Sequence, residues 1–365
     1  MKWAEHLGKK LLRRTCRRLF SSPPRDPSEL VPTEVKRILV VRQDNRIGNL
    51  ILQIPFLKAL HKTFPNAEIT VLLGNTFAEL YANLPEVQHR IIYRHIHLAR
   101  HPWQWISFIR NLSKGKWDVA FECGHPHVVS LNNASLAYFS KAPFRVGFQR
   151  DDAEIFLNVL LKAPDHCHYA TTLKSLIAPW NTTEQTFPMS LPLPIAHEHT
   201  WQRLWEKAGL DEKSRVVLIW SGGRYEKRWQ TDFLISIATR ITQEFGALWV
   251  PVIGIGPGEQ DIEMTSRQTS DYKVIEFNGP IEELWAFMNR CHAVISGDTG
   301  PMHLAVALGI PTLALFRVDN AWEYGHDDGK YHRAITVTNN DPSSTIIDFL
   351  KKLPENSCPK STIYY

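Results

Sequence analysis

The sequence predicts an α/β protein built from two Rossmann-like, doubly wound domains that face each other across a cleft. A chain of 365 residues is too long for one ordinary hydrophobic core and fits two domains of roughly 150 residues each. Short apolar runs alternate with segments of helical apolar spacing, as in parallel sheets covered by helices. The alternation breaks once, around residues 178–199, where two Pro- or Asn-containing stretches indicate an interdomain connection.

The first domain begins at residues 37–42, an apolar run of the kind found in buried parallel strands. A turn over 43–48 precedes a helix expected at 50–64, in which Pro55 marks either a kink or the first turn. A second helix is expected over 77–84. The remaining strands of this domain are expected at 68–73, 91–92, 117–121 and 144–148.

The second domain repeats the alternation. Its strands are expected at 215–220, 248–253, 273–277, 292–296 and 312–316. A final helix over 343–353 could pack back on the first domain. The expected organisation is therefore a basic arm with a linker (1–34), two Rossmann-like domains (35–185 and 186–340), and a C-terminal helix and tail (341–365).

Positive charge is concentrated in the N-terminal arm. The chain has a formal charge of +5, whereas residues 1–37 alone hold ten Lys/Arg and four Asp/Glu. Within 1–20, apolar residues such as Trp3, Leu11 and Phe20 can share one side of a helix with cations around it, which suits an anionic membrane surface. A solvated arm, or a helix packed on the body of the protein, is the alternative.

Composition argues against several other classes of protein. The hydrophobic content of 44% and charged content of 22% are typical of globular chains, and no run of about 18 apolar residues could span a membrane. Five scattered cysteines without a Cys-x-x-Cys pair indicate neither a disulfide framework nor a zinc site, so we expect a reducing, cytoplasmic compartment. Histidines cluster at 89–101, 125–127 and 166–168 without the partners of a metal site, so no metal is expected.

The most informative run, residues 296–305, reads Ser-Gly-Asp-Thr-Gly-Pro-Met-His-Leu-Ala and joins a predicted strand to a predicted helix. Such a turn directs backbone N–H groups and the positive end of the helix dipole at an anion. Asp298 can accept hydrogen bonds from amides or sugar hydroxyls, and Thr299 and Gly300 can contact a phosphate. His303 can reach the phosphates or a sugar, or it can be a core histidine. A helix cap explains one of these residues but not the whole run.

Two other turns of the second domain contain glycines. Ser221, Gly222 and Gly223 follow a predicted strand, and their amides can approach a diphosphate to which Lys227 adds a cation. A tight turn with exposed cations is the alternative. The turn at 254–259 also follows a strand, but its glycine spacing is not that of a dinucleotide-binding motif.

The run at 296–305, continued by Ala307-Leu308-Gly309-Ile310-Pro311, resembles the C-terminal donor-site motif of glycosyltransferase family 9, the ADP-heptose:lipopolysaccharide heptosyltransferases. The resemblance implies the GT-B fold, with an acceptor domain over 35–185 and a donor domain over 186–340. It also implies that Lys227 stabilises the departing diphosphate and that Glu259, unless simply solvated, faces the donor ribose. The implied donor-binding residues are Ser221, Gly222, Gly223, Lys227, Glu259, Asp298, Thr299, Gly300, Pro301, Met302 and His303.

The chain departs from the family pattern at two positions. It has Gly48-Asn49 where the family has a Gly-Asp pair whose carboxylate is the general base, and an amide has no useful basicity. Asn49 can still orient an acceptor hydroxyl, and Asp44 is the nearest substitute carboxylate, or else a turn residue. Arg317 follows the last strand where the family usually has Gly, which leaves the donor identity open. The implied catalytic residues are Asp44, Asn49, Lys227 and His303.

The resemblance implies inverting, metal-independent transfer of a heptose from an ADP-sugar to a lipopolysaccharide core or related lipid-linked glycan at the inner face of the cytoplasmic membrane. The ADP-sugar is then a substrate, and neither a cofactor nor a nucleic-acid partner is expected. Asn49 keeps a second hypothesis open, a catalytically impaired protein that binds a nucleotide-sugar or glycan. An NAD-dependent oxidoreductase is a third hypothesis, supported only by the fold class and the glycines at 254–258.

Overall fold

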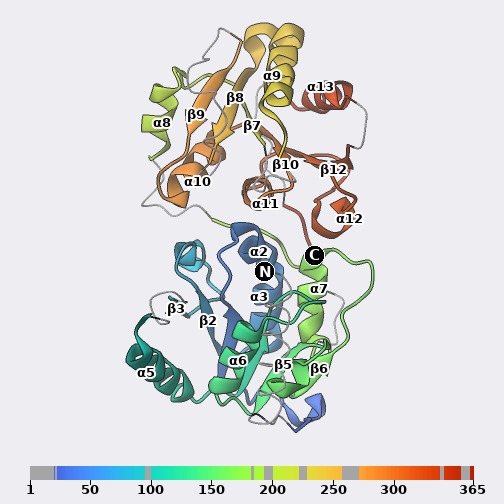
Figure 1. Ribbon diagram of the computed structural model, residues 1–365. Helices are drawn as coiled ribbons and strands as arrows, with labels where there is room; N and C mark the ends of the chain where they lie inside the picture. Colours follow the sequence, from blue (N-terminus) through green and yellow to red (C-terminus); the bar gives the residue numbers. More distant parts are fainter. Residues whose placement is uncertain are drawn as a thin grey trace, which may run out of the picture. The chain divides into compact units, whose positions relative to one another are not determined.

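A computed structural model describes residues 20, 23–94, 100–181, 185–192, 200–221, 228–256, 271–337, 341–354 and 362–365. The chain divides into two compact units, the first formed by Met1–Asn45 and Pro55–Phe187 and the second by Arg46–Ile54 and Pro188–Tyr365. Each unit contains one six-stranded sheet (Figure 1). The described part of the chain contains no helix that is long and apolar enough to cross a membrane.

The first sheet has the strand order β3-β2-β1-β4-β5-β6, and all its neighbouring strands are parallel. Its strands are β1 (Arg37–Arg42), β2 (Glu68–Gly74), β3 (His89–Tyr93), β4 (Val119–Glu122), β5 (Phe144–Phe148) and β6 (Val159–Leu161). The order reverses direction between β1 and β4. In doubly wound sheets this reversal opens a crevice at the carboxyl ends of the two strands, where ligands bind.

The helices of the first unit differ from the sequence prediction in two places. They are α3 (Ile54–Thr63), α5 (Pro102–Ser113), α6 (Leu131–Phe139) and α7 (Tyr169–Lys174), with short 3-10 turns η1 (Pro27–Glu29), η2 (Ala78–Tyr81), η3 (Ala153–Ile155) and η4 (Ser175–Ile177). The predicted helix over 50–64 is broken at Gln53, and Pro55 lies in the first turn of α3. The predicted helix over 77–84 is wrong. Only η2 forms there, because Pro85 disfavours helical backbone at the residue before it.

The second sheet has the order β12-β11-β10-β7-β8-β9, which is the topology of the first sheet repeated. Its strands, all parallel, are β7 (Val216–Trp220), β8 (Val250–Ile255), β9 (Lys273–Glu276), β10 (Ala293–Gly297), β11 (Thr312–Phe316) and β12 (His332–Thr336). Here the order reverses between β7 and β10. The turns after β7 and β10 therefore flank the point at which doubly wound sheets bind ligands.

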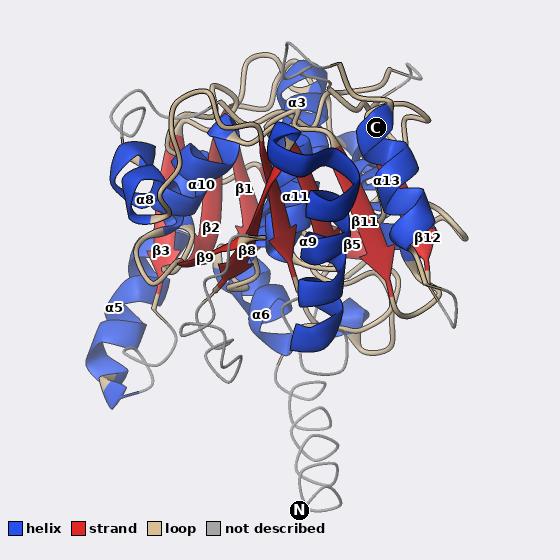
Figure 2. Cartoon of the chain, turned by 90° about the horizontal axis from the view of Figure 1, so that it is seen from above, coloured by secondary structure: helices blue, strands red, loops and turns tan. Residues whose placement is uncertain are grey.

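The second unit contains helices from both of its chain segments. They are α2 (Ile47–Leu52), α8 (Trp201–Lys207), α9 (Thr231–Phe245), α10 (Ile281–Arg290), α11 (Gly300–Ala307), α12 (Ala321–Tyr324) and α13 (Ser343–Lys351), with the turn η7 (Gly246–Leu248). Helices α9 and α13 lie side by side in Figures 1 and 2. Ile237 and Ile241 of α9 share a core with Ile346 and Phe349 of α13. The apolar face of the C-terminal helix is thus buried within its own unit.

The last described residues also belong to the second unit. Met189 donates its backbone N–H to the carbonyl of Ile363 at 2.9 Å, and Pro188 forms an antiparallel bridge with Tyr364. This short pairing brings Tyr365 against His326.

Candidate functional site

The turn between β10 and α11 forms the centre of the candidate site. Thr299 has extended backbone angles and caps α11, its hydroxyl accepting the N–H of Met302 at 3.4 Å and lying 3.2 Å from the hydroxyl of Ser296. Asp298 accepts a hydrogen bond from the amide of Asn320 at 3.2 Å. Pro301 has no N–H and Met302 and His303 donate to Thr299, so the N–H of Gly300 is the donor of the first turn without an acceptor inside the helix, at the positive end of the helix dipole where an anion is favoured.

The end of β7 lies directly beside this turn. A Cβ atom added to Gly297 would lie 2.6 Å from the carbonyl oxygen of Ser221, so only glycine allows the two turns to approach so closely. Ser221 is fully buried, and its carbonyl accepts the N–H of Trp229 at 3.1 Å. The loop that carries Gly222, Gly223 and Lys227 lies outside the described residues. Of its two ends, Ser221 lies against Gly297, and Arg228 accepts a hydrogen bond from Arg317.

His303 is part of a buried chain of polar side chains. Its side chain is on α11, is 4% exposed, and places Nδ1 at 2.8 Å from Nε2 of His326. Nδ1 of His326 in turn contacts the hydroxyl of Tyr365. Burial raises the pKa of Tyr365 well above its ordinary value, so its phenol keeps its proton near neutral pH. With both rings neutral, the protons of this chain can run from Tyr365 to His303 or from His303 to Tyr365, and each direction satisfies both contacts.

Helix α2 packs against the first turn of α11. Two glycines make this possible, because a Cβ on Gly48 would lie 2.6 Å from the ring of His303, and a Cβ on Gly300 would collide with Ile47. Asn49, the residue that replaces the family's acid, follows Gly48 on α2 and is half-buried. The structure therefore brings the helix of Asn49 next to the turn that contains Asp298 to His303.

Arg317 lies at the carboxyl end of β11 and holds the loop that carries Lys227. Its guanidinium donates to the carbonyl of Arg228 at 2.6 Å and lies 5.6 Å from the ring centre of Trp229. Arg317, where the resemblance implies Gly, thus adds a hydrogen bond that fixes Arg228 at the end of the loop. Met302, by contrast, is completely buried against Phe316, so its side chain supports α11 from the core and is not positioned to contact a donor.

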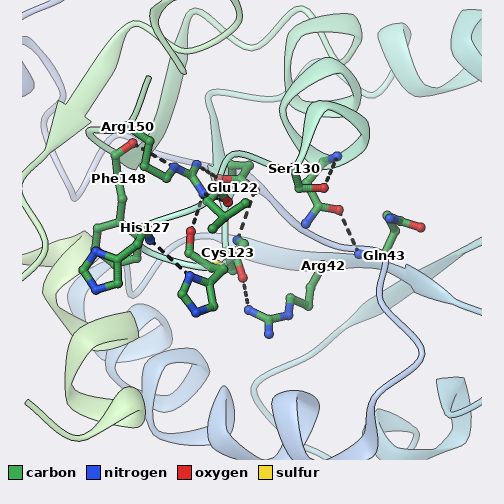
Figure 3. Close-up of polar contacts among 12 residues, drawn as sticks. Arg42, Gln43, Glu122, Cys123, His127, Ser130, Phe148 and Arg150 are labelled. Atoms are coloured by element: carbon green, nitrogen blue, oxygen red, sulfur yellow. Dashed lines mark hydrogen bonds and ion pairs between the residues drawn. The ribbon is translucent and has the colours of Figure 1, made fainter. Parts of the chain in front are cut away.

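The carboxyl end of the first sheet carries a second polar cluster, centred on Arg42. Nε of Arg42 donates to Asp44 at 2.8 Å, and Nη1 donates to the hydroxyl of Tyr169 at 2.9 Å. Nη1 also donates to the carbonyl of Cys123 (Figure 3). Burial raises the pKa of Tyr169, so its phenol is neutral near pH 7. The side chain of Asp44 is 30% exposed, whereas that of Arg42 is buried. Asp44 is thus a partly exposed carboxylate anchored through one oxygen.

A buried ion pair fixes the adjoining turn after β4. The carboxylate of Glu122 pairs with Arg150, and both side chains are almost completely buried. Arg150 also donates to the backbone carbonyl of His125 at 2.6 Å and to that of Val128 at 3.3 Å, as drawn in Figure 3. This places His125 and His127 as exposed side chains on a loop that the ion pair holds in shape.

The predicted residues fall into three groups. The structure gathers Asp298, Thr299, Gly300, Pro301, His303, Ser221 and Asn49 in the second unit, and places Asp44 at the sheet edge of the first unit. The predicted Gly222, Gly223, Lys227 and Glu259, and the basic arm over 1–19, lie outside the described residues. Sequence reasoning missed His326, Tyr365 and the Glu122–Arg150 pair. The sequence did contain a signal for the Glu122–Arg150 pair, because Glu122 is a charged residue at the end of the apolar strand Val-Ala-Phe.

Comparison with protein families gives one match. A family model described as Glycosyltransferase family 9 (heptosyltransferase) matches residues 105–353. A search of curated proteins returned no match.

Several solved structures have the same fold. A glycosyl transferase family 9 protein from Veillonella parvula superposes with a TM-score of 0.71 at 22% identity, covering 89% of this chain and 92% of that chain. The ADP-heptose lps heptosyltransferase II of E. coli gives a TM-score of 0.68 at 17% identity, covering 87% of this chain and 98% of that chain. E. coli heptosyltransferase WaaC, solved with ADP, gives 0.67 at 15% identity, covering 87% of this chain and all (100%) of that chain; it was also solved with ADP-2-deoxy-2-fluoro heptose. These matches confirm the predicted α/β fold of the GT-B type with two Rossmann-like sheets.

Proposed function

This chain belongs to glycosyltransferase family 9, and from that premise we propose that it transfers a heptose from an ADP-linked donor to a hydroxyl of the lipopolysaccharide core or a related lipid-linked glycan. The observation that carries the proposal is the β10–α11 turn at the point where the second sheet reverses its order. A helix N-terminus at such a point is a binding site for the diphosphate of a nucleotide. The E. coli relative solved with ADP and with a fluorinated ADP-heptose supports this choice of donor.

His303 has the chemistry of a donor-site residue. Its Nδ1 lies 2.8 Å from Nε2 of His326, and an imidazole nitrogen can donate a hydrogen bond to a phosphate or sugar oxygen. We propose that His303, which is linked to His326 and Tyr365, positions the sugar-diphosphate, and that Lys227 and the N-terminus of α11 stabilise the charge that develops on the leaving ADP.

The reaction is a single displacement at the anomeric carbon. The acceptor oxygen forms a bond to that carbon on the face opposite ADP, the bond from the carbon to the β-phosphate oxygen breaks, and its electron pair leaves with ADP. The acceptor proton moves to a carboxylate. We assign this role to Asp44, which is partly exposed and has one oxygen held by Arg42, and we assign to Asn49 the orientation of the acceptor hydroxyl. The proposed reaction uses no metal, and the absence of an Asp-x-Asp motif for a chelated nucleotide-sugar from the sequence supports this part of the proposal.

A second function remains in view because of Asn49. A protein that binds the ADP-sugar or a glycan without turnover would also keep the β10–α11 turn, and the ion pair of Asp44 with Arg42 would then have a structural role. The same residues would then serve recognition alone.

Acceptor-dependent release of ADP separates the two functions. Wild-type protein, incubated with ADP-heptose and a delipidated core oligosaccharide, should release ADP only when the acceptor is present. Asp44→Asn should lower the turnover by about 10²-fold or more while leaving ADP affinity unchanged, as expected for loss of a general base. Full turnover in Asp44→Asn would remove Asp44 as the base. ADP binding by the wild type without release from any ADP-sugar would favour the binding protein.

A further inference from the structure

Helix α5 of the first unit has two apolar sides, only one of which is packed. Trp105, Phe108 and Ile109 pack on the core of that unit, and the ring centre of Trp105 lies 5.7 Å from that of Phe139. On the other side, Trp103 is 82% exposed and Ile106 is 51% exposed. Residues three apart on a helix are neighbours, so these two side chains form one exposed apolar stripe.

Cations continue this stripe along α5. Arg110 and Lys114 follow Trp103 at helical spacing on the same side, and both are exposed. Arg100, also exposed, precedes the helix. No acidic residue lies on α5 itself, so the stripe presents an aromatic and an aliphatic side chain between positive charges.

The stretch of sequence that contains α5 has very few Asp and Glu residues. Residues 87–117 contain six Lys/Arg and four His but no Asp or Glu. Residues 87–150 contain nine Lys/Arg and two acidic residues, a formal charge of +7 in a chain whose total is +5. Both acids are engaged, since Asp118 accepts two backbone N–H groups at 2.7 and 2.8 Å and Glu122 is buried against Arg150.

From this combination we propose that α5 is an interfacial helix that lies on an anionic lipid surface. Trp103 and Ile106 enter the boundary between headgroups and acyl chains, while Arg100, Arg110 and Lys114 meet lipid phosphates. An exposed Trp flanked by cations and free of acids is the composition of helices that lie in a membrane interface, whereas protein interfaces are depleted in Lys at their centres. This inference rests on the proposed function, because the lipid-linked acceptor of that function identifies the membrane that α5 would meet.

Sedimentation with lipid vesicles tests the proposal on the full chain. Vesicles of phosphatidylcholine with about one third phosphatidylglycerol should bind the wild type, and pure phosphatidylcholine vesicles should bind it at least about tenfold more weakly, since each cation near an anionic surface contributes to binding. Trp103→Ser with Ile106→Ser, and separately Arg110→Gln with Lys114→Gln, should each lower the partition coefficient about tenfold.

Two controls make the test specific. Trp322→Ser removes another exposed tryptophan, 49% exposed and next to Glu323, and should leave vesicle binding unchanged. Replacing Lys9, Lys10, Arg13 and Arg14 by Gln measures the separate contribution of the basic arm. If the Trp103/Ile106 variant binds anionic vesicles as well as the wild type does, α5 is not the membrane contact.

Two further outcomes distinguish other occupants and the proposed reaction. The wild type could be a dimer and the Trp103/Ile106 variant a monomer, with neither protein binding vesicles. That result would assign the stripe to a second copy of the chain and overturn the proposal. Release of ADP with a delipidated acceptor should be equal in the wild type and the α5 variants. Loss of vesicle binding with intact release supports the lipid contact, whereas absent release in every protein counts against the proposed function and not against α5.

Discussion

The buried pair of Glu122 and Arg150 allows a quantitative test of how the first unit is held together. Glu122→Gln keeps the shape of the side chain but leaves the Arg150 guanidinium buried without its counter-charge. Removing one partner of a buried pair costs about 3–5 kcal/mol. The side chain of Arg150 is 2% exposed and that of Glu122 is 0% exposed, so neither charge can turn to water and the upper half of that range is expected.

Replacing both partners should cost much less. Glu122→Leu with Arg150→Met removes both buried charges. The remaining loss is that of the hydrogen bonds from Arg150 to backbone carbonyls and from the Gly124 N–H to Glu122, roughly 1 kcal/mol each. The double variant should therefore be more stable than Glu122→Leu alone, with a coupling free energy of at least about 2 kcal/mol.

Urea unfolding followed by circular dichroism measures these free energies. Because the chain has two compact units, the loss should appear in one transition and leave the other in place. Glu244→Gln, which breaks the exposed pair with Lys351, is the matched control and should leave both midpoints unchanged. A Glu122→Gln variant within about 1 kcal/mol of the wild type, or additive single and double variants, would refute the reasoning.

Further predictions concern the donor site and the reaction. Lys227→Ala should lower the turnover about 10²–10³-fold, as expected when a group that stabilises the leaving charge is lost; a change confined to KM in steady-state kinetics would contradict this. Gly297→Ala should lower the free energy of unfolding by roughly 1–3 kcal/mol and weaken ADP binding in calorimetry, because its Cβ would meet the backbone of Ser221 at 2.6 Å; unchanged stability and affinity would contradict the close approach. His326→Phe should weaken ADP binding about tenfold, because it removes the hydrogen-bond partner of His303 Nδ1; unchanged ADP binding would show that His303 acts only in the core. EDTA should leave ADP release unchanged; a loss that Mg²⁺ restores would show that a metal takes part.

Much of the fold could be predicted because its core strands are short apolar runs. The predicted strands at 37–42, 144–148 and 312–316 coincide with β1, β5 and β11. The edge strands β6 and β12 were missed. The sequence of β12, His-Arg-Ala-Ile-Thr, is neither apolar nor alternating, and β12 becomes a strand through its pairing with β11.

The site could be predicted only where its residues are consecutive. The turn after β10 holds Asp298 to His303 in one stretch, so the type of turn and its anion-binding potential follow from sequence. His326 and Tyr365 come from distant parts of the chain, and their contact with His303 depends on the docking of the last residues against Pro188 and Met189. No local pattern marks such a long-range chain of hydrogen bonds. Burial of Met302 is equally a tertiary property, because it depends on Phe316 of the next strand.

The central claim is that the second unit binds the diphosphate of an ADP-sugar at the N-terminus of α11. A crystal structure with ADP bound tests it most directly. We predict density for the two phosphates at the N-terminus of α11, within hydrogen-bond distance of the Gly300 N–H, with His303 and the loop after Ser221 beside them. Density for ADP at the carboxyl edge of the first sheet, or away from α11 altogether, would contradict the account.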